Sequence, residues 1–256
     1  MNQAILTRRI SQHWLGIFLV VYGLFNLLPF LAPVLMNSGL DTGGKAIYTA
    51  YSPLCHQMAQ RSFFLFGQDS MYNTDQLPVT LTGTGDDALT LRHFKGTDEL
   101  GWKVAWSDRM VYMYGSVWLA AFIYALLRKK LRPLSPIWFA VLLLPMVIDG
   151  GTHFLSDLSG IAQGFRYDNA WLASLTGHVF PESFYSGDEF GSFNSLMRLL
   201  SGITFGIACV WLAFPYIDRS FQQSTQQMSS RFERLQELEQ QLNAEHEKLL
   251  SQQKHG

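Results

Sequence analysis

The sequence predicts an all-α membrane protein with four transmembrane helices, followed by a helical tail. Only 15% of the 256 residues are charged and 48% are hydrophobic, whereas a soluble domain usually has about 25% charged residues. Three runs approach the ~20 mainly apolar residues that cross a bilayer as a helix, and a fourth is shorter but uncharged. The C-terminal segment has an apolar residue at every seventh position, which is typical of a long amphipathic helix.

Four apolar runs define the predicted spans. The first extends from Trp14 to about Met36. Because this run is longer than a signal-peptide core and lacks a clear small-residue cleavage site, we interpret it as a retained anchor. The other three spans are predicted at about residues 111–127, 134–149 and 196–217. Together with their connections, they form a predicted integral membrane domain over residues 1–220.

Basic residues predict the orientation of the spans. Arg8 and Arg9 precede the first span, four basic residues lie within 128–132, and Arg219 follows the fourth span. Because cytoplasmic loops are enriched in Lys and Arg, we expect a multi-pass protein of the cell membrane with both termini in the cytoplasm. The segments 37–110 and 150–193 then lie outside.

The two outer segments differ in pattern. Within the first, residues 78–91 alternate in polarity around a turn rich in Gly and Asp at 83–87. Such alternation around a turn predicts a β-hairpin. The second outer segment is rich in Gly, Ser and aromatic residues and has no clear period.

Residues 221–256 form a predicted cytoplasmic tail. Apolar residues recur in it every seven positions: Met228, Leu235, Leu242 and Leu249. This seam is typical of a coiled coil. A single amphipathic helix packed on the protein or the membrane surface also fits, because Arg231 and Glu245 interrupt the second apolar row. The tail therefore predicts either self-association or contact with a protein partner, and leaves the choice open.

Composition and motifs exclude several classes of function. The net charge of −1 gives no support for nucleic-acid binding through bulk charge, so membrane lipid and protein are the expected partners. The two cysteines, Cys55 and Cys209, do not indicate a disulfide scaffold. No phosphate loop, nucleophile elbow or dinucleotide fingerprint is evident in the sequence.

Nine polar residues from distant parts of the chain are predicted to lie together at the outer membrane boundary. They are Cys55, His56, Gln57, Arg61, Arg109, Asp149, His153, Asn194 and Arg198. Asp149 is central, because a carboxylate at the end of a membrane-length run is costly unless it is paired or solvated. His153 would share a helix face with it if the helix continues that far. We predict that Asp149 is ionised and pairs with Arg198, with Arg61 and Arg109 as the next candidates.

Two main interpretations of this cluster compete. In the structural one, an arginine pairs with Asp149, and the two histidines form hydrogen bonds near the interface. In the functional one, sulfur, nitrogen and oxygen ligands bind a metal such as zinc. The candidate metal ligands are Cys55, His56, Asp149 and His153. A proton or small-ligand site is a third interpretation.

Three motifs occur in order along the chain. They are Cys55-His56-Gln57 with Arg61-Ser62-Phe63, then Pro145-x-x-Ile148-Asp149-Gly150, then Asn194-x-x-x-Arg198-Leu199-x-x-Gly202-x-x-x-Gly206. Together they resemble the marks of an uncharacterised family of integral membrane proteins, domain of unknown function 2085, over about residues 52–215. Members often have Cys-x-Arg-Cys before the second span, where this chain has Ser107-Asp108-Arg109-Met110. The resemblance implies a membrane fold but supplies no established activity. A metal or redox role that depends on those two cysteines is not implied for this chain, because it lacks them.

These observations favour a non-enzymatic function. The leading interpretation is an integral membrane scaffold or accessory subunit that binds a partner through its tail or outer loops. The alternative is a metal-dependent membrane enzyme or ion-handling protein that uses the outer cluster. The pair Gly202 and Gly206 predicts close packing of the last span against a neighbouring one rather than dimerisation.

Overall fold

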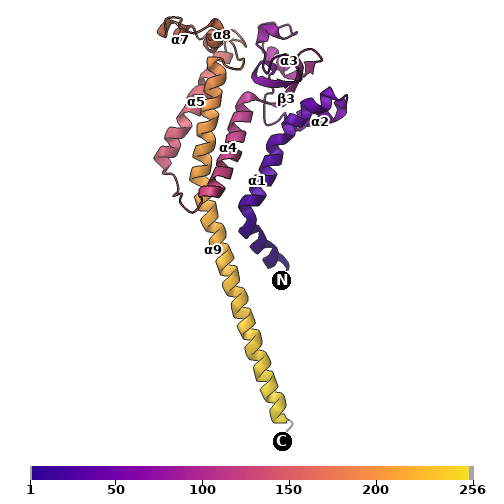
Figure 1. Cartoon of the computed structure of the whole chain (residues 1–256), viewed down its shortest axis with the longest axis vertical. Coiled ribbons are helices and arrows are strands. Elements are labelled where there is room, and N and C mark those ends of the chain that lie inside the picture. Colours follow the sequence, from indigo (N-terminus) through magenta and orange to yellow (C-terminus); the bar gives the residue numbers. More distant parts are fainter. Residues whose placement is uncertain (1, 254–256) are drawn as a thin grey trace.

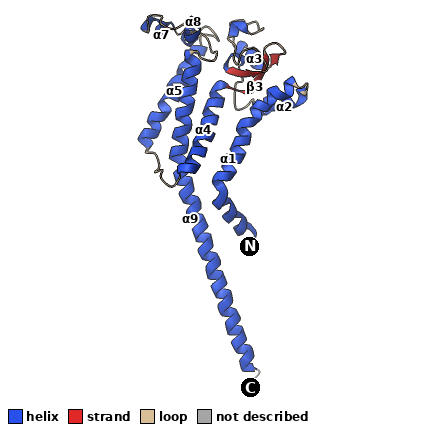
Figure 2. Ribbon diagram, in the orientation of Figure 1, coloured by secondary structure: helices blue, strands red, loops and turns tan. Residues whose placement is uncertain are grey.

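Four long helices dominate the computed structural model, which describes residues 2–253 (Figures 1 and 2). They are α1 (Asn2–Asn37), α4 (Asp108–Leu127), α5 (Pro136–Asp157) and α9 (Phe193–Gln253). Each contains a stretch long and apolar enough to cross a membrane. The prediction of four membrane-length helices is therefore confirmed.

Shorter elements form the two long connections. Between α1 and α4 lie α2 (Asp41–Tyr51), η1 (Ala59–Arg61), β1 (Ser62–Leu65), η2 (Thr74–Gln76), α3 (Asp87–His93), β2 (Gly96–Thr97) and β3 (Gly101–Ser107). Between α5 and α9 lie α6 (Phe165–Asp168), α7 (Ala170–Leu175) and α8 (Glu182–Tyr185). Figure 1 shows both connections at one end of the bundle, which we call the loop end, and the start of α1 and the end of α9 on the opposite side.

The outward surface of the bundle is apolar. Leu24, Leu126, Ile137 and Val147 are each more than 60% exposed. A soluble monomer rarely exposes a contiguous apolar surface of this kind. The exposed side chains therefore occupy the positions that lipid would cover.

Close packing joins α4 to α9. A Cβ atom added at Gly202 would lie 2.7 Å from the Cβ atom of Tyr112, and one added at Gly206 would lie 2.6 Å from the backbone nitrogen of Val117. The hydroxyl of Ser116 also donates a hydrogen bond to the carbonyl oxygen of Gly202, at 2.6 Å. The two glycines thus allow the backbones to approach, as the sequence predicted.

A polar layer lies near each end of the bundle. Away from the loop end, buried Asp218 forms an ion pair with Arg128 and accepts a hydrogen bond from Trp14 Nε1 at 3.1 Å. At the loop end, Arg198 is buried in a second polar cluster. Twenty residues of helix separate Arg198 from Asp218, or about 30 Å at 1.5 Å per residue. This distance matches the hydrocarbon thickness of a bilayer.

The predicted hairpin at residues 78–91 is wrong. Helix α3 begins within this segment, and the turn before it is held by the Asp87 carboxylate, which accepts hydrogen bonds from the backbone nitrogens of Thr82 (2.7 Å) and Gly83 (2.8 Å). Such local bonds offer the backbone an alternative to strand pairing. The small antiparallel sheet forms elsewhere, in the order β1-β3-β2, with Ser62 opposite Ser107.

A buried lysine ties the sheet to its neighbours. Lys103 of β3 is fully buried, and its Nζ donates to the carbonyl oxygens of Gln57 at 2.5 Å and Arg92 at 2.9 Å. Burial, followed by the charge of Lys95, lowers the pKa of Lys103 well below its ordinary value. The sequence analysis did not identify this residue.

Two helices extend beyond their predicted ends. α5 continues eight residues past Asp149, which therefore lies inside the helix rather than at its end. α9 runs without a break through the predicted boundary at residue 220. The side chains of Glu245 and Leu249, and residues 254–256, lie outside the described part of the chain.

Candidate functional site at the loop end

An ion-pair network fills the space between the helix ends at the loop end. Its members are Arg61, Arg109, Arg166 and Arg198 with Asp108, Asp149, Asp157 and Asp188. The four arginines balance the four aspartates in formal charge. Buried charges persist in low-dielectric surroundings only when they are paired and hydrogen-bonded, so this network requires all of its elements to pack together.

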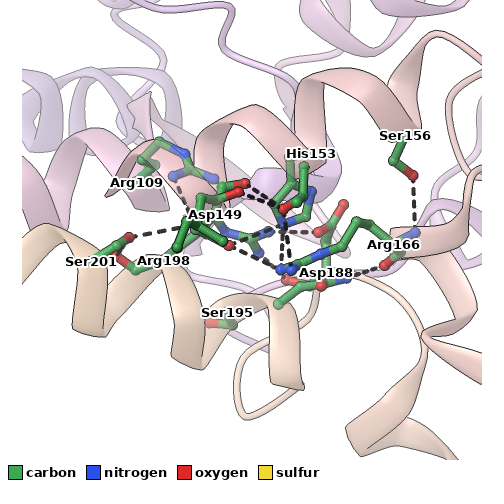
Figure 3. Close-up of polar contacts among 12 residues, drawn as sticks. Arg109, Asp149, His153, Ser156, Arg166, Asp188, Ser195, Arg198 and Ser201 are labelled. Atoms are coloured by element: carbon green, nitrogen blue, oxygen red, sulfur yellow. Dashed lines mark hydrogen bonds and ion pairs between the residues drawn. The ribbon is translucent and has the colours of Figure 1, made fainter. Parts of the chain in front are cut away.

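Asp149 binds two arginines, and neither is Arg198 (Figure 3). Its Oδ2 lies 2.8 Å from Arg109 Nη1, and its Oδ1 accepts a hydrogen bond from Arg166 Nη2 at 2.9 Å. The predicted pair with Arg198 is wrong because the α9 residue that faces Asp149 is Ser201, whose hydroxyl lies 3.4 Å from Oδ2. Arg109, a second candidate from the sequence, is a partner.

Arg198 is directed to a different pair of carboxylates. Its Nε donates to Asp108 Oδ2 at 2.5 Å, its Nη1 to Asp188 Oδ1 at 2.6 Å, and its Nη2 to the carbonyl oxygen of Asp188 at 3.0 Å. All three guanidinium nitrogens are therefore satisfied, although the side chain is only 1% exposed. Arg198 joins α9 to the start of α4 and to the loop before α9.

Asp188 is shared between Arg198 and Arg61. Arg61 Nε lies 2.9 Å from Asp188 Oδ2, and its two Nη atoms each donate to Asp157 at 2.8 Å. Burial favours the neutral form of Asp188, but the charges of Arg61 and Arg198 outweigh burial and hold its pKa well below the usual range. The carboxylate is therefore ionised in the folded protein.

Asn194 supports the network from α9. Its Nδ2 donates to the carbonyl oxygens of Arg166 at 2.6 Å and Gly187 at 2.8 Å. These bonds hold α6 and the loop before α9 against the first turn of α9. Asn194 thus positions two network segments without joining the ion pairs itself.

The remaining predicted residues lie beside the network. The Sγ atom of buried Cys55 accepts hydrogen bonds from the backbone nitrogens of Gln57 and Ser107, both at 3.3 Å. Gln57 Nε2 donates to the carbonyl oxygens of Tyr48 and Ala105, both at 2.9 Å. His56 is exposed. Cys55 and Gln57 therefore join the segment after α2 to β3.

The predicted metal centre is not supported. Among the residues whose placement the structure describes, no three His, Cys, Asp or Glu side chains are grouped so that they could hold a metal ion. Asp149 is occupied by two arginines, and Cys55 by backbone amides. The alternative function that depends on Cys55, His56, Asp149 and His153 as ligands therefore lacks a site.

His153 lies one helical turn after Asp149 on the same face of α5, as the sequence predicted for a continuing helix. The side chain is buried, and its Nε2 is 3.1 Å from Arg166 Nη2. Its Nδ1 is also buried and has no hydrogen-bond partner. A buried polar group without a partner is costly, and this nitrogen shares that state with the buried Nε of Arg166 in the same network.

Sequence reasoning missed four members of the network, one of which, Asp108, directly precedes the predicted Arg109. Asp157 had a usable signal, because positions 149, 153 and 157 repeat at the four-residue spacing of one helix face. Arg166 and Asp188 lie in irregular outer segments and carry no such periodic signal.

Known proteins resemble the part of the chain that holds most of this network. A family model described as "Predicted membrane protein (DUF2085)" matches residues 99–212. The predicted resemblance is confirmed over that segment. The DUF2085 segment contains every network member except Arg61, and the motif at residues 55–63 lies before it.

A curated relative adds no activity. An uncharacterized protein of Methanocaldococcus jannaschii, MJ1492, is 26% identical over 170 residues, which cover 62% of this chain and 85% of that protein. No solved structure matches the chain. The DUF2085 match thus identifies a predicted membrane protein without an assigned reaction.

Proposed function

We propose that this protein is a non-enzymatic membrane scaffold or accessory subunit that binds a protein partner through the distal part of α9. The continuity of α9 carries this proposal. One helix extends from the ion-pair network, through the bundle, to Gln253. The 35 residues after Asp218 correspond to an arm of about 50 Å at 1.5 Å per residue.

The base of this arm is firmly held. Arg198 fixes the first turns of α9 to two carboxylates, and Gly206 packs against α4. At the other end of the bundle, Asp218 is joined to Arg128 and Trp14. A helix fixed at both levels supports a role in presenting a binding surface at a set position.

The distal part of the arm carries exposed apolar side chains. Met228 and Phe232 are half-buried near the start of α1, where Phe232 shares a cleft of about 520 Å³ with Arg8 and Arg9. Further along, the exposed fractions are 61% for Leu235, 53% for Leu238 and 65% for Leu242. These three leucines share one helix face. An apolar stripe of this kind supports binding to a helix, either of a second copy or of another protein.

Site-specific photocrosslinking of the full-length protein tests the proposal. We expect a photoreactive benzoylphenylalanine at Leu242 to give an adduct of defined mass in membranes, because that position lies on the apolar stripe. At Gln240, which is exposed on the opposite face of the same turn, the same group should give none. An adduct near twice 29.1 kDa would identify a second copy, and another defined mass a different protein.

Two results would contradict the proposed binding surface. One is the absence of a defined adduct at Leu242. The other is an adduct at Leu242 that persists unchanged when Leu235 and Leu238 are both replaced by serine. Each would mean that the apolar stripe does not hold a partner.

We also propose that the arm lies in the cytoplasm, with both termini inside, because basic residues gather at that end of the bundle. Cysteines placed at the exposed positions Asp86 and Gln240 test this orientation. A membrane-impermeant maleimide should label the first from outside intact cells and the second only after permeabilisation. Labelling of the protein without introduced cysteines gives the background from the native Cys55 and Cys209. Labelling of both introduced cysteines from one side would refute the orientation.

A further inference from the structure

A cleft of about 610 Å³ opens beside the ion-pair network at the loop end. Residues of α4 and α5 form two of its walls, and residues 83–85 and 158–161 contribute to its rim. Three arginines and two aspartates line it: Arg61, Arg109, Arg198, Asp108 and Asp157. Each of these arginines is paired with at least one carboxylate, so the lining presents guanidinium donors whose charge is balanced within the network.

His153 supplies an unused hydrogen-bond donor in this cleft. A guanidinium group only donates hydrogen bonds, so His153 Nε2, at 3.1 Å from Arg166 Nη2, acts as the acceptor. The neutral ring then carries its proton on Nδ1. This atom is buried and has no partner, and His153 is 5% exposed and lines the cleft. A residue of the cleft lining thus has a buried donor that lacks an acceptor.

Arg109 supplies further donors beside His153. Its Nη1 contacts Asp149 Oδ2 at 2.8 Å and Met146 Sδ at 3.6 Å. Its Nε and Nη2 donate to no residue in the described part of the chain, and the side chain is 18% exposed. Arg109 and His153 flank the same carboxylate of Asp149. The two residues are therefore neighbours in the cleft lining, with Arg109 Nη1 and His153 Nε2 both directed at Asp149.

Part of the cleft lining is apolar. Met110, Phe154 and Leu158 line it, and the last two are 66% and 69% exposed. Phe154 and Leu158 belong to α5 or directly follow it, at the end of a helix that we treat as a membrane span. The cleft therefore joins polar donors to exposed apolar side chains at the loop end of α5.

We propose that this cleft binds an amphiphile with an anionic head group. The head group accepts hydrogen bonds from His153 Nδ1 and Arg109, and the hydrocarbon chain lies against Met110, Phe154 and Leu158. A carboxylate and a phosphate share the required chemistry, since both offer charged acceptor oxygens. This site is separate from the leucine stripe on α9, so it does not depend on the proposed partner.

Ligand-dependent stability of the full-length protein in a non-ionic detergent tests the site. The probes are oleate, phosphatidylglycerol, phosphatidylcholine and inorganic phosphate. We expect oleate, phosphatidylglycerol or both to raise the unfolding temperature, because binding to the folded state stabilises it. Oleate alone would identify a carboxylate head group, and phosphatidylglycerol alone a phosphate. Phosphatidylcholine and inorganic phosphate should give no shift.

Three variants connect the binding to the cleft. His153→Gln keeps an acceptor for Arg166 but removes the Nδ1 donor, and Arg109→Lys keeps a positive charge beside Asp149 but removes the guanidinium fork. Each should weaken binding about tenfold, which is the effect of one charge-assisted hydrogen bond. Ala88→Trp fills the cleft from α3 without altering an ion pair. His93→Gln, at an exposed position outside the cleft lining, is the matched control.

Several outcomes would overturn the proposal. Equal stabilisation by phosphatidylcholine would remove the requirement for an anion, and equal stabilisation by inorganic phosphate would remove the requirement for a chain. Unchanged binding by His153→Gln, Arg109→Lys and Ala88→Trp would place the ligand elsewhere. If the first two variants unfold without ligand, Ala88→Trp alone decides, because it leaves the ion-pair network intact.

Discussion

Replacement of Asp188 by asparagine is expected to destabilise the protein by about 3 kcal/mol, because the loss of one partner leaves buried charges uncompensated. Asp188 is bonded to both Arg61 and Arg198, and these side chains are 15% and 1% exposed. The measurement is unfolding of the purified protein in detergent. Asp98→Asn, at an exposed position in the same outer region, is the control and should change stability little.

The effect of Asp188→Asn should be independent of pH over about pH 5 to 8. The folded pKa of Asp188 is lowered below its ordinary value. A group with a lowered folded pKa contributes its full stability above the unfolded pKa of about 3.9, and loses it as the pH falls toward the folded pKa. A difference between variant and wild type that disappears at neutral pH would contradict an ionised Asp188.

A double-mutant cycle distinguishes direct pairing from general damage. Arg61→Gln alone should also destabilise the protein, because it leaves Asp188 and Asp157 with one fewer positive partner. The double variant of Asp188→Asn and Arg61→Gln should lose less than the sum of the two single losses. Strictly additive losses would mean that the two groups do not interact.

Gly206→Ala is expected to cost about 1–3 kcal/mol, because the new methyl group overpacks the contact between α4 and α9. Its Cβ would lie 2.5 Å from the carbonyl carbon of Ser116 and 2.6 Å from Val117 N. Because both are backbone atoms, a helix must shift to make room.

Gly115→Ala is the matched control on the neighbouring helix. A Cβ there would meet no atom within 4 Å, so the higher helix propensity of alanine should leave stability unchanged or raise it by up to about 1 kcal/mol. Both variants are compared by unfolding in mixed detergent micelles. If Gly206→Ala and Gly115→Ala lose equal stability, close packing against α4 is not the reason for a glycine at position 206.

Features that depend on local pattern can be predicted from the sequence of this protein. Four apolar runs specify four membrane-length helices, because a segment in lipid must satisfy its own backbone hydrogen bonds. The four-residue spacing of Asp149 and His153 specifies a shared helix face. Gly202 and Gly206 specify a close helix contact, because only small residues allow two backbones to approach.

Which charges meet depends on the three-dimensional packing of the helices and loops. Asp149 was expected to pair with Arg198, but the packing of α5 on α9 presents Ser201 to it. Its second arginine, Arg166, comes from α6, which no periodic pattern marks. The fold also places Cys55 among backbone amides of Gln57 and Ser107, which occupy its sulfur. An ion pair or metal site requires side chains within a few ångströms of one another, and sequence spacing fixes such distances only within one element.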